Sequence, residues 1–118
     1  MTLSPDENLS KLVDLISHSN QVVFGVIDKE KNLLGVIHFN DIREIIFKTE
    51  LYNTLIVKEL MTKPPAVILS TGSMEEVLKK FDETRQWNLP VVKDKIYQGF
   101  LSKARILSEY RSELMKTI

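Results

Sequence analysis

Apolar residues at helical spacing predict two amphipathic helices in separate parts of the chain. The first is expected over residues 5–17, and its apolar positions are Leu9, Leu12, Val13 and Ile16. The second is expected over residues 74–84, and its apolar positions are Met74, Val77, Leu78 and Phe81. Each helix follows a serine with a glutamate three positions later, the capping-box pattern of a helix start: Ser4 with Glu7, and Ser73 with Glu76.

Runs of β-branched and apolar residues predict four strands, over residues 22–28, 33–39, 88–93 and 97–101. The polar turn 29–32 joins the first two strands into a hairpin, and Asp94-Lys95 joins the last two. An amphipathic segment follows each hairpin directly, with apolar residues Ile42, Ile45 and Ile46 in one and Ile106, Leu107 and Tyr110 in the other. The order helix, strand, strand, helix is therefore expected twice.

The two halves align as an internal repeat, in which Gly35 of the first hairpin corresponds to Gly99 of the second. Two copies of a unit too small to bury its own apolar face pack against each other, and the seam between them is a natural ligand site. We predict an α/β (α+β) fold, one compact domain of two pseudo-symmetric repeats, each a small sheet flanked by two amphipathic helices. Residues 1–50 form the first repeat, residues 51–64 a connector and residues 65–118 the second.

The amino-acid composition of the chain excludes several classes of function. The chain has 16 basic and 16 acidic residues, so neither nucleic-acid binding nor direct membrane binding is expected. It has no cysteine, which excludes disulfides, thiolate nucleophiles and cysteine-ligated zinc. It also lacks a phosphate loop, a dinucleotide-binding glycine motif, a His-Glu-x-x-His motif and a nucleophile elbow. We therefore expect neither an enzyme nor a metal site.

The strand-to-helix turns carry the clearest functional pattern. Residues 35–41 and 99–105 each contain a glycine, two apolar residues, a polar residue and a further polar residue three positions later. A helix start presents unpaired N–H groups that favour anions. The pattern resembles the CBS (cystathionine-β-synthase) domain, whose repeats carry glycine, two apolar residues, Ser or Thr, two variable residues and Asp. The resemblance covers essentially the whole chain, including the lead-in segment 2–7, the strands 24–27 and 89–92, and the connector 57–61.

The resemblance implies that a regulatory adenine nucleotide, ATP, ADP or AMP, binds between the repeats without being a required cofactor. An aspartate of one repeat would bind the ribose, the nearby hydroxyl residue would face phosphate, and the other repeat would sandwich the base. The favoured cleft would use Asp41, His38, Pro65, Ala66, Val67, Leu89 and Pro90. The second cleft would use Thr2, Leu3, Val23, Phe24, Ser102, Lys103 and Arg105.

Three positions depart from the family pattern. His38 stands in place of the hydroxyl residue, Val67 in place of a threonine and Arg105 in place of the ribose aspartate. A guanidinium has donors only, so it cannot accept from ribose hydroxyls, but Arg105 and Lys103 could meet phosphates. Simpler roles remain open as well, because Asp41 could cap a helix and His38 could be a structural residue. For Trp87 we favour packing over base stacking.

The parent protein is inferred from a narrower resemblance. Residues 87–103 look like the C-terminal cytoplasmic portion of bacterial ClC-type chloride channels and transporters. This resemblance implies a module that controls a membrane-embedded channel, located in the cytoplasm as the cytosolic domain of an inner-membrane protein. A homodimer is expected for a separate reason, because two amphipathic helices beside a small sheet leave apolar surface that a symmetric partner would cover. Two alternatives remain: a ligand-free dimerisation or interaction module, and an accessory regulatory domain of a nucleotide-metabolism enzyme or magnesium transporter.

Overall fold

The computed structural model of the protein describes residues 2–116, except the side chain of residue 113. The chain forms two compact units. Unit 1 extends to Pro64 and includes Lys95–Tyr97, whereas unit 2 contains Pro65–Asp94 and continues from Gln98. None of the helices within residues 2–116 combines the length and the apolar character needed to span a membrane.

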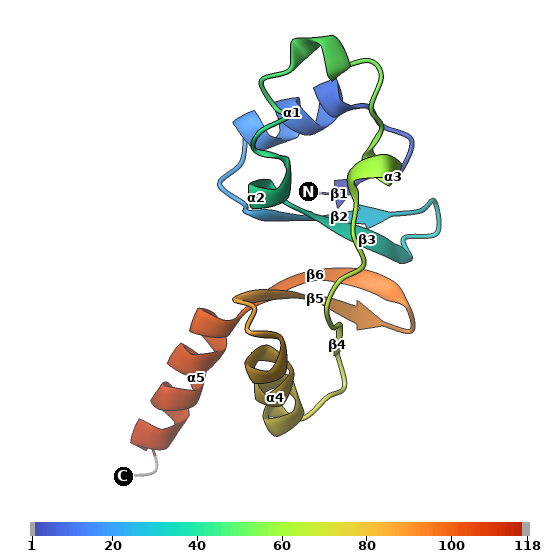
Figure 1. Ribbon diagram of the computed structural model, residues 1–118. Coiled ribbons are helices and arrows are strands. Elements are labelled where there is room, and N and C mark those ends of the chain that lie inside the picture. The colour runs from blue at the N-terminus through green and yellow to red at the C-terminus, as the bar shows by residue number, and fades with distance from the viewer. Residues whose placement is uncertain (1, 117–118) are drawn as a thin grey trace. The chain divides into compact units, whose positions relative to one another are not determined.

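Unit 1 is a three-stranded sheet with its helices on one face (Figure 1). Its elements are β1 (Thr2–Leu3), α1 (Leu9–Ser17), β2 (Val23–Ile27), β3 (Leu33–His38), α2 (Phe39–Ile42), η1 (Thr49–Leu51) and α3 (Val57–Leu60). The sheet has the order β1-β2-β3, with β1 parallel and β3 antiparallel to β2. The buried core gathers apolar residues from the sheet and the helices: Leu3, Leu9, Leu12, Phe24, Val26, Ile37, Ile42 and Val57.

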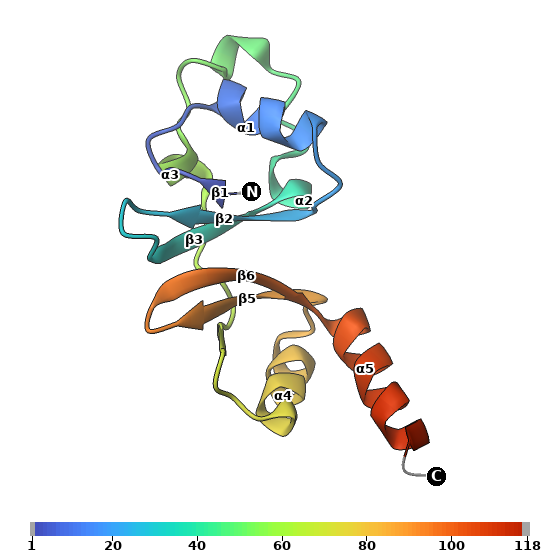
Figure 2. The ribbon, with the colours of Figure 1, turned by 180° about the vertical axis from the view of Figure 1, so that it is seen from behind.

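Unit 2 repeats this plan with fewer helices. Its elements are β4 (Ile68–Leu69), α4 (Met74–Thr84), β5 (Asn88–Lys93), β6 (Ile96–Ser102, whose first two residues belong to unit 1) and α5 (Lys103–Lys116). The sheet order is β4-β5-β6, and β4 is parallel to β5. The core consists of Ile68, Val77, Phe81, Leu89 and Ile106. In Figure 2, α4 lies along this sheet and α5 extends away from it.

Both predicted hairpins and the mixed α and β character are confirmed. The turn at Asp94 and Lys95 has two positive φ angles, 51° and 70°, as in the type I′ turns that suit two-residue hairpins. The start of α4 is also confirmed, because the Glu76 amide donates to Ser73 Oγ at 3.2 Å. The two-residue strands β1 and β4 were not predicted, because two residues are too few to show a period.

The predicted start of the first helix is wrong, since α1 begins at Leu9 rather than residue 5. Ser4 and Glu7 do interact, with the Ser4 amide donating to Glu7 Oε1 at 3.1 Å, but they close a turn. A helix from residue 5 would use the Pro5 and Glu7 carbonyls internally. These oxygens instead accept from the amides of residues 58 and 57, at 2.9 and 2.7 Å. Asn8 caps the helix in place of Ser4.

The predicted helix after the first hairpin is also shorter than expected. Only Phe39–Ile42 is helical, and turns follow to Phe47. The chain then returns over the core, where Leu51, Tyr52 and Leu55 pack with the half-buried Ile45 and Ile46. A continuous helix would not allow this early return.

The connector pairs with the sheet of unit 1. Thr62 and Val36 of β3 exchange two backbone hydrogen bonds, each of 2.8 Å. The Met61 side chain lies so close to Gly35 that a Cβ there would be 3.0 Å from its sulfur. The connector is therefore part of the folded unit.

Hydrogen bonds in the turn between β2 and β3 should make a pH-dependent contribution to stability. Asp28 Oδ1 accepts from the Asn32 and Glu30 amides at 2.8 and 2.9 Å, and Oδ2 accepts from Asn32 Nδ2 at 3.1 Å. These bonds, with the Asn32 amide first, lower the pKa of Asp28. A lowered folded-state pKa stabilises the protein above the unfolded pKa of about 3.9, and the contribution disappears as pH falls through the folded value.

We expect Asp28→Asn to lower Tm at pH 6, and the difference from wild type to shrink below about pH 4. Thermal unfolding of both proteins between pH 2.5 and 7 measures this difference in Tm. Asn32→Ala removes one bond but leaves the carboxylate, so it should retain part of the pH dependence. A Tm difference that stays constant across this range would contradict the assignment.

Candidate functional site

The first strand-to-helix turn exposes the carboxylate of Asp41 next to the end of strand β3. His38 ends β3 and occupies the N-cap position of α2, while the Phe39 amide donates to the Val22 carbonyl at 2.8 Å. The His38 side chain makes no capping hydrogen bond. Asp41 lies in the first turn of α2 and is exposed. Its carboxylate can accept hydrogen bonds from a ligand, and nothing observed in α2 assigns it the capping role.

The remaining predicted residues of unit 1 lie in neighbouring strands. Thr2 pairs with Gly25, and Val23 pairs with His38, so β1, β2 and the end of β3 are in one register. Thr2 is exposed, but the side chains predicted for the same cleft are core residues: Leu3, Val23 and Phe24. They can therefore offer backbone atoms to a ligand, and their side chains support the sheet.

The lead-in segment of unit 2 is held by α4. Lys80 Nζ donates to the Val67 carbonyl at 2.6 Å, which fixes the segment before β4. Ala66 and Val67 are half-buried and Pro65 is exposed. The predicted strand residues Leu89 and Pro90 are buried, so they correspond to the buried Phe24 and its neighbours in unit 1. Among these five predicted residues, the side chains that a ligand can reach are therefore those of segment 65–67.

The second strand-to-helix turn is basic, and Lys103 is already engaged. Its Nζ lies 3.4 Å from Asp82 Oδ1 and 5.3 Å from the centre of the Trp87 ring. The Lys103 amide also donates to the Trp87 carbonyl at 2.9 Å. Trp87 is 63% exposed, so it does not belong to the core of unit 2, and the alternative packing role, contact with a second copy of the chain, stays a prediction. The ring supports an ammonium group.

Arg105 is paired within its own helix. Its Nε lies 3.4 Å from Glu109 Oε1, and both side chains are exposed. The Arg105 amide approaches Ser102 Oγ at 3.4 Å, so the hydroxyl faces the start of α5. An anion at this turn would meet two cations, each with a carboxylate partner. The exposed pair of Arg105 with Glu109 contributes about 0.2–1 kcal/mol, so a phosphate can compete for this cation.

The structure therefore places the predicted residues in two sets. Unit 1 holds Thr2, Leu3, Val23, Phe24, His38 and Asp41, and unit 2 holds Pro65, Ala66, Val67, Leu89, Pro90, Ser102, Lys103 and Arg105. Each unit supplies a lead-in segment, a buried strand and a polar strand-to-helix turn. Asp82 and Glu109, the partners of the two cations, were not predicted from the sequence. The spacing of Arg105 and Glu109 by four positions on one helix is a signal that indicates the second pair.

Comparison with known proteins agrees with this internal repetition. The family model of the CBS domain matches residues 1–48 and 57–112. Inosine-5'-monophosphate dehydrogenase of Methanocaldococcus jannaschii is 29% identical over 94 residues, which make up 80% of this chain and 18% of that protein. The chain thus spans only a small part of the length of the curated relative that it matches.

Two solved structures show the same fold. CBSX2, determined in complex with AMP, has a TM-score of 0.76 and 23% identity, covering 100% of this chain and 90% of that one. CbpB, determined in complex with c-di-AMP, has a TM-score of 0.79 and 21% identity, covering 99% of this chain and 80% of that one. At these identities the likeness establishes the fold alone.

Proposed function

Because the chain belongs to the CBS domain family and carries a tandem pair of these regulatory domains, we propose that it senses an adenine nucleotide rather than catalysing a reaction. The observation that carries the proposal is the exposed Asp41 carboxylate at the turn after β3. This position matches the ribose-binding aspartate of the family pattern. The complexes of CBSX2 with AMP and of CbpB with c-di-AMP support a ligand of this class.

We assign the residues to two nucleotide sites. In the favoured site, Asp41 and His38 act with Pro65, Ala66, Val67, Leu89 and Pro90, the last two through backbone atoms since their side chains are buried. In the second, Ser102, Lys103 and Arg105 act with Thr2, Leu3, Val23 and Phe24. The repeats are residues 1–50 and 65–118, joined by residues 51–64. Binding regulates the protein if the nucleotide prefers one conformation over another.

The proposed parent is a ClC-type chloride channel or transporter, and the proposed state is a cytoplasmic homodimer. This assignment rests on the resemblance of residues 87–103. A second candidate is a regulatory domain within an enzyme of nucleotide metabolism, favoured by the 29% identity to inosine-5'-monophosphate dehydrogenase. The sequence preceding this chain in its parent distinguishes them, because a channel requires several apolar spans there.

Titration calorimetry tests the ligand directly. ATP, ADP, AMP and c-di-AMP are each titrated into the whole chain, with GTP as the control for the base. We expect saturable binding of at least one adenine ligand and weaker binding of GTP. Absence of heat and of any thermal stabilisation with all four adenine ligands would leave the interaction-module alternative.

Arg105 should make the second site sensitive to the number of phosphates. With the favoured site removed by Asp41→Ala, we expect Arg105→Ala to weaken ATP binding by a factor between about 1.4 and 5 and AMP binding less, because an exposed charge pair contributes about 0.2–1 kcal/mol. The difference should shrink with added salt. The measurement is ATP and AMP affinity at 50 and 300 mM salt.

Arg111→Ala provides the matched control, since it removes an exposed arginine from a later turn of α5. Glu109→Gln removes the partner of Arg105 and should strengthen ATP binding. An ATP-to-AMP ratio that is the same in wild type and Arg105→Ala would show that Arg105 does not contact phosphate.

A further inference from the structure

The lead-in segment of unit 2 is paired less fully with its neighbouring strand than the lead-in segment of unit 1. In unit 1, the pairing of β1 with β2 starts at Thr2, which lies opposite Gly25. Val67 and Pro90 occupy the corresponding positions of the internal repeat in unit 2. The pairing of β4 with β5 starts only at the next residue, Ile68. Val67 therefore lies outside the ladder that holds its counterpart in unit 1.

Pro90 explains why the ladder of unit 2 stops at this point. The Val92 carbonyl of β5 accepts from the Ser70 amide at 3.0 Å, and alternate residues of a strand turn their backbone groups toward the same neighbour. The backbone of Pro90 therefore faces the lead-in segment, but a proline has no N–H to donate. Unit 1 has Gly25 at this position, which keeps its N–H.

Lys80 of α4 supplies an attachment of another kind. Its Nζ donates to the Val67 carbonyl at 2.6 Å, and its side chain is half-buried. Among the residues whose side chains the structure describes, no carboxylate lies within ion-pair distance of this ammonium group. The next residue, Phe81, is fully buried, so the helix that carries Lys80 is fixed to the core. The hydrogen bond therefore ties the lead-in segment to a rigid part of unit 2.

Unit 1 has an apolar residue where unit 2 has Lys80. The repeat aligns Lys80 with Leu15, which packs against the core of unit 1. A leucine side chain cannot donate a hydrogen bond, and the lead-in segment of unit 1 is held by the pairing of Thr2 in the sheet. The loss of a backbone donor at Pro90 and the gain of a side-chain donor at Lys80 thus occur in the same unit.

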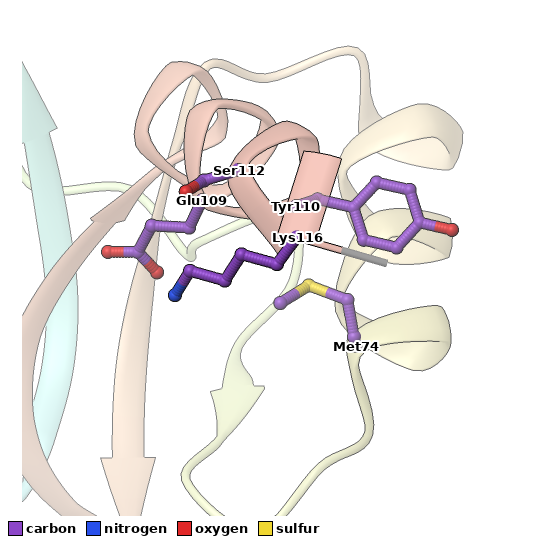
Figure 3. Close-up of a pocket in the computed structure, with 5 residues that line it drawn as sticks. All are labelled: Met74, Glu109, Tyr110, Ser112 and Lys116. Atoms are coloured by element: carbon purple, nitrogen blue, oxygen red, sulfur yellow. The ribbon is translucent and has the colours of Figure 1, made fainter. Parts of the chain in front are cut away.

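The groove between α4 and α5 is a separate feature of unit 2. It has a volume of about 530 Å³ and is lined by Met74, Glu109, Tyr110, Ser112 and Lys116 (Figure 3). Met74 is the first residue of α4, and Lys80 lies about 9 Å further along the helix axis. Lys80 does not line the groove, so a substitution of Lys80 tests the lead-in segment and not the groove.

We propose that Lys80 is a positioning residue of the favoured nucleotide site, where its ammonium group holds segment 65–67 in place of the hydrogen bond that Pro90 cannot make. This inference rests on the proposed nucleotide site, to which the segment belongs. A segment that is already held loses less conformational entropy when a ligand binds, so the attachment increases both the affinity and the selection of the base. Lys80 acts through the segment and does not touch the nucleotide.

Amide hydrogen exchange without nucleotide tests the attachment in Lys80→Met, which keeps most of the aliphatic stem and removes the donor. The amides of Ile68 and Ser70 should exchange about three- to tenfold faster, the factor that corresponds to one ordinary hydrogen bond. Lys79→Met is the matched control, since Lys79 is exposed and pairs with Glu83 within the same helix. Unchanged exchange in Lys80→Met overturns the proposal whether or not nucleotides bind.

Calorimetry well below Tm tests the consequence for the ligand. Lys80→Met should lower ATP affinity about three- to tenfold and reduce the preference for ATP over GTP, because a loose segment selects the base less well. The ratio of ATP affinity to AMP affinity should stay at the wild-type value. Lys80→Arg can still donate and should keep most of the affinity, and Lys79→Met and Met74→Ala should bind as wild type does. In Asp41→Ala, Lys80→Met should cause no further loss.

The two measurements separate this inference from the proposed function. Faster exchange with unchanged ATP affinity overturns the positioning role of Lys80. A loss that is larger for ATP than for AMP, and that shrinks with added salt, would show a direct phosphate contact and also overturns it. If wild type binds no nucleotide, the proposed function fails and the positioning role with it, while exchange still decides whether Lys80 holds the segment.

Discussion

Replacing Phe24 by alanine is expected to lower the free energy of unfolding by about 3–5 kcal/mol, enough to unfold a large fraction of a marginally stable chain. Phe24 is the second residue of β2 and is fully buried in the cluster that joins the sheet of unit 1 to its helices. Truncation removes buried apolar surface and leaves a cavity that neighbouring side chains fill only in part.

The chain supplies a matched control in Phe47, which is 81% exposed in the turn after α2. Phe47→Ala should change the free energy of unfolding by no more than about 0.5 kcal/mol. Urea unfolding of both variants, followed by far-ultraviolet circular dichroism, gives the comparison. Similar small losses for the two substitutions would mean that Phe24 is not a core residue and that unit 1 is assembled differently.

Asp41→Ala is expected to weaken adenine-nucleotide binding about tenfold to a hundredfold. A carboxylate that accepts ribose hydroxyls makes charge-assisted hydrogen bonds of about 1.5–3 kcal/mol, whereas a neutral hydroxyl contact contributes about 0.5–1.5 kcal/mol. Ser102→Ala should therefore cause a smaller loss. Because Asp41 is exposed, its removal should leave the fold intact.

Calorimetry with ATP, ADP and AMP measures this effect, with Asp14→Ala as the control for loss of an exposed carboxylate on α1. Asp41→Ala should reduce the affinity for a 2'-deoxy nucleotide less than it reduces the affinity for the ribonucleotide. If Asp41→Ala binds as tightly as wild type, the ribose assignment is incorrect and the nucleotide must use other residues.

Local sequence signals predict the start of a helix correctly where the hydrogen bonds that fix this start lie within the same segment. Helix α4 begins after Ser73 as predicted because the capping serine and the apolar spacing agree over the same eleven residues. Helix α1 begins later than predicted because its start depends on residues more than forty positions away. The Leu9 amide donates to the Leu55 carbonyl at 2.9 Å, and the Glu7 carbonyl accepts from Val57. Capping residues alone do not reveal such distant partners.

The sequence predicted the types of residue in the candidate site, but it did not predict how buried these residues are or which side chains they contact. The repeated order of glycine, apolar and polar residues located both strand-to-helix turns, including the exposed Asp41. Sequence spacing did not show that Phe24 and Leu89 are core residues, because a buried strand and a ligand-facing strand have the same apolar composition. It also did not show the pairing of Lys103 with Asp82, since these residues meet only through folding.

The two hydrogen bonds between Thr62 and Val36 give the connector a mechanical character. A segment bonded to a sheet behaves as a strut that moves with the sheet, whereas an unbonded segment behaves as a hinge. Up to Thr62 the connector is a strut of unit 1. After Thr62, the rings of Pro64 and Pro65 fix φ, so the torsions left free to rotate in this stretch are mainly the ψ angles.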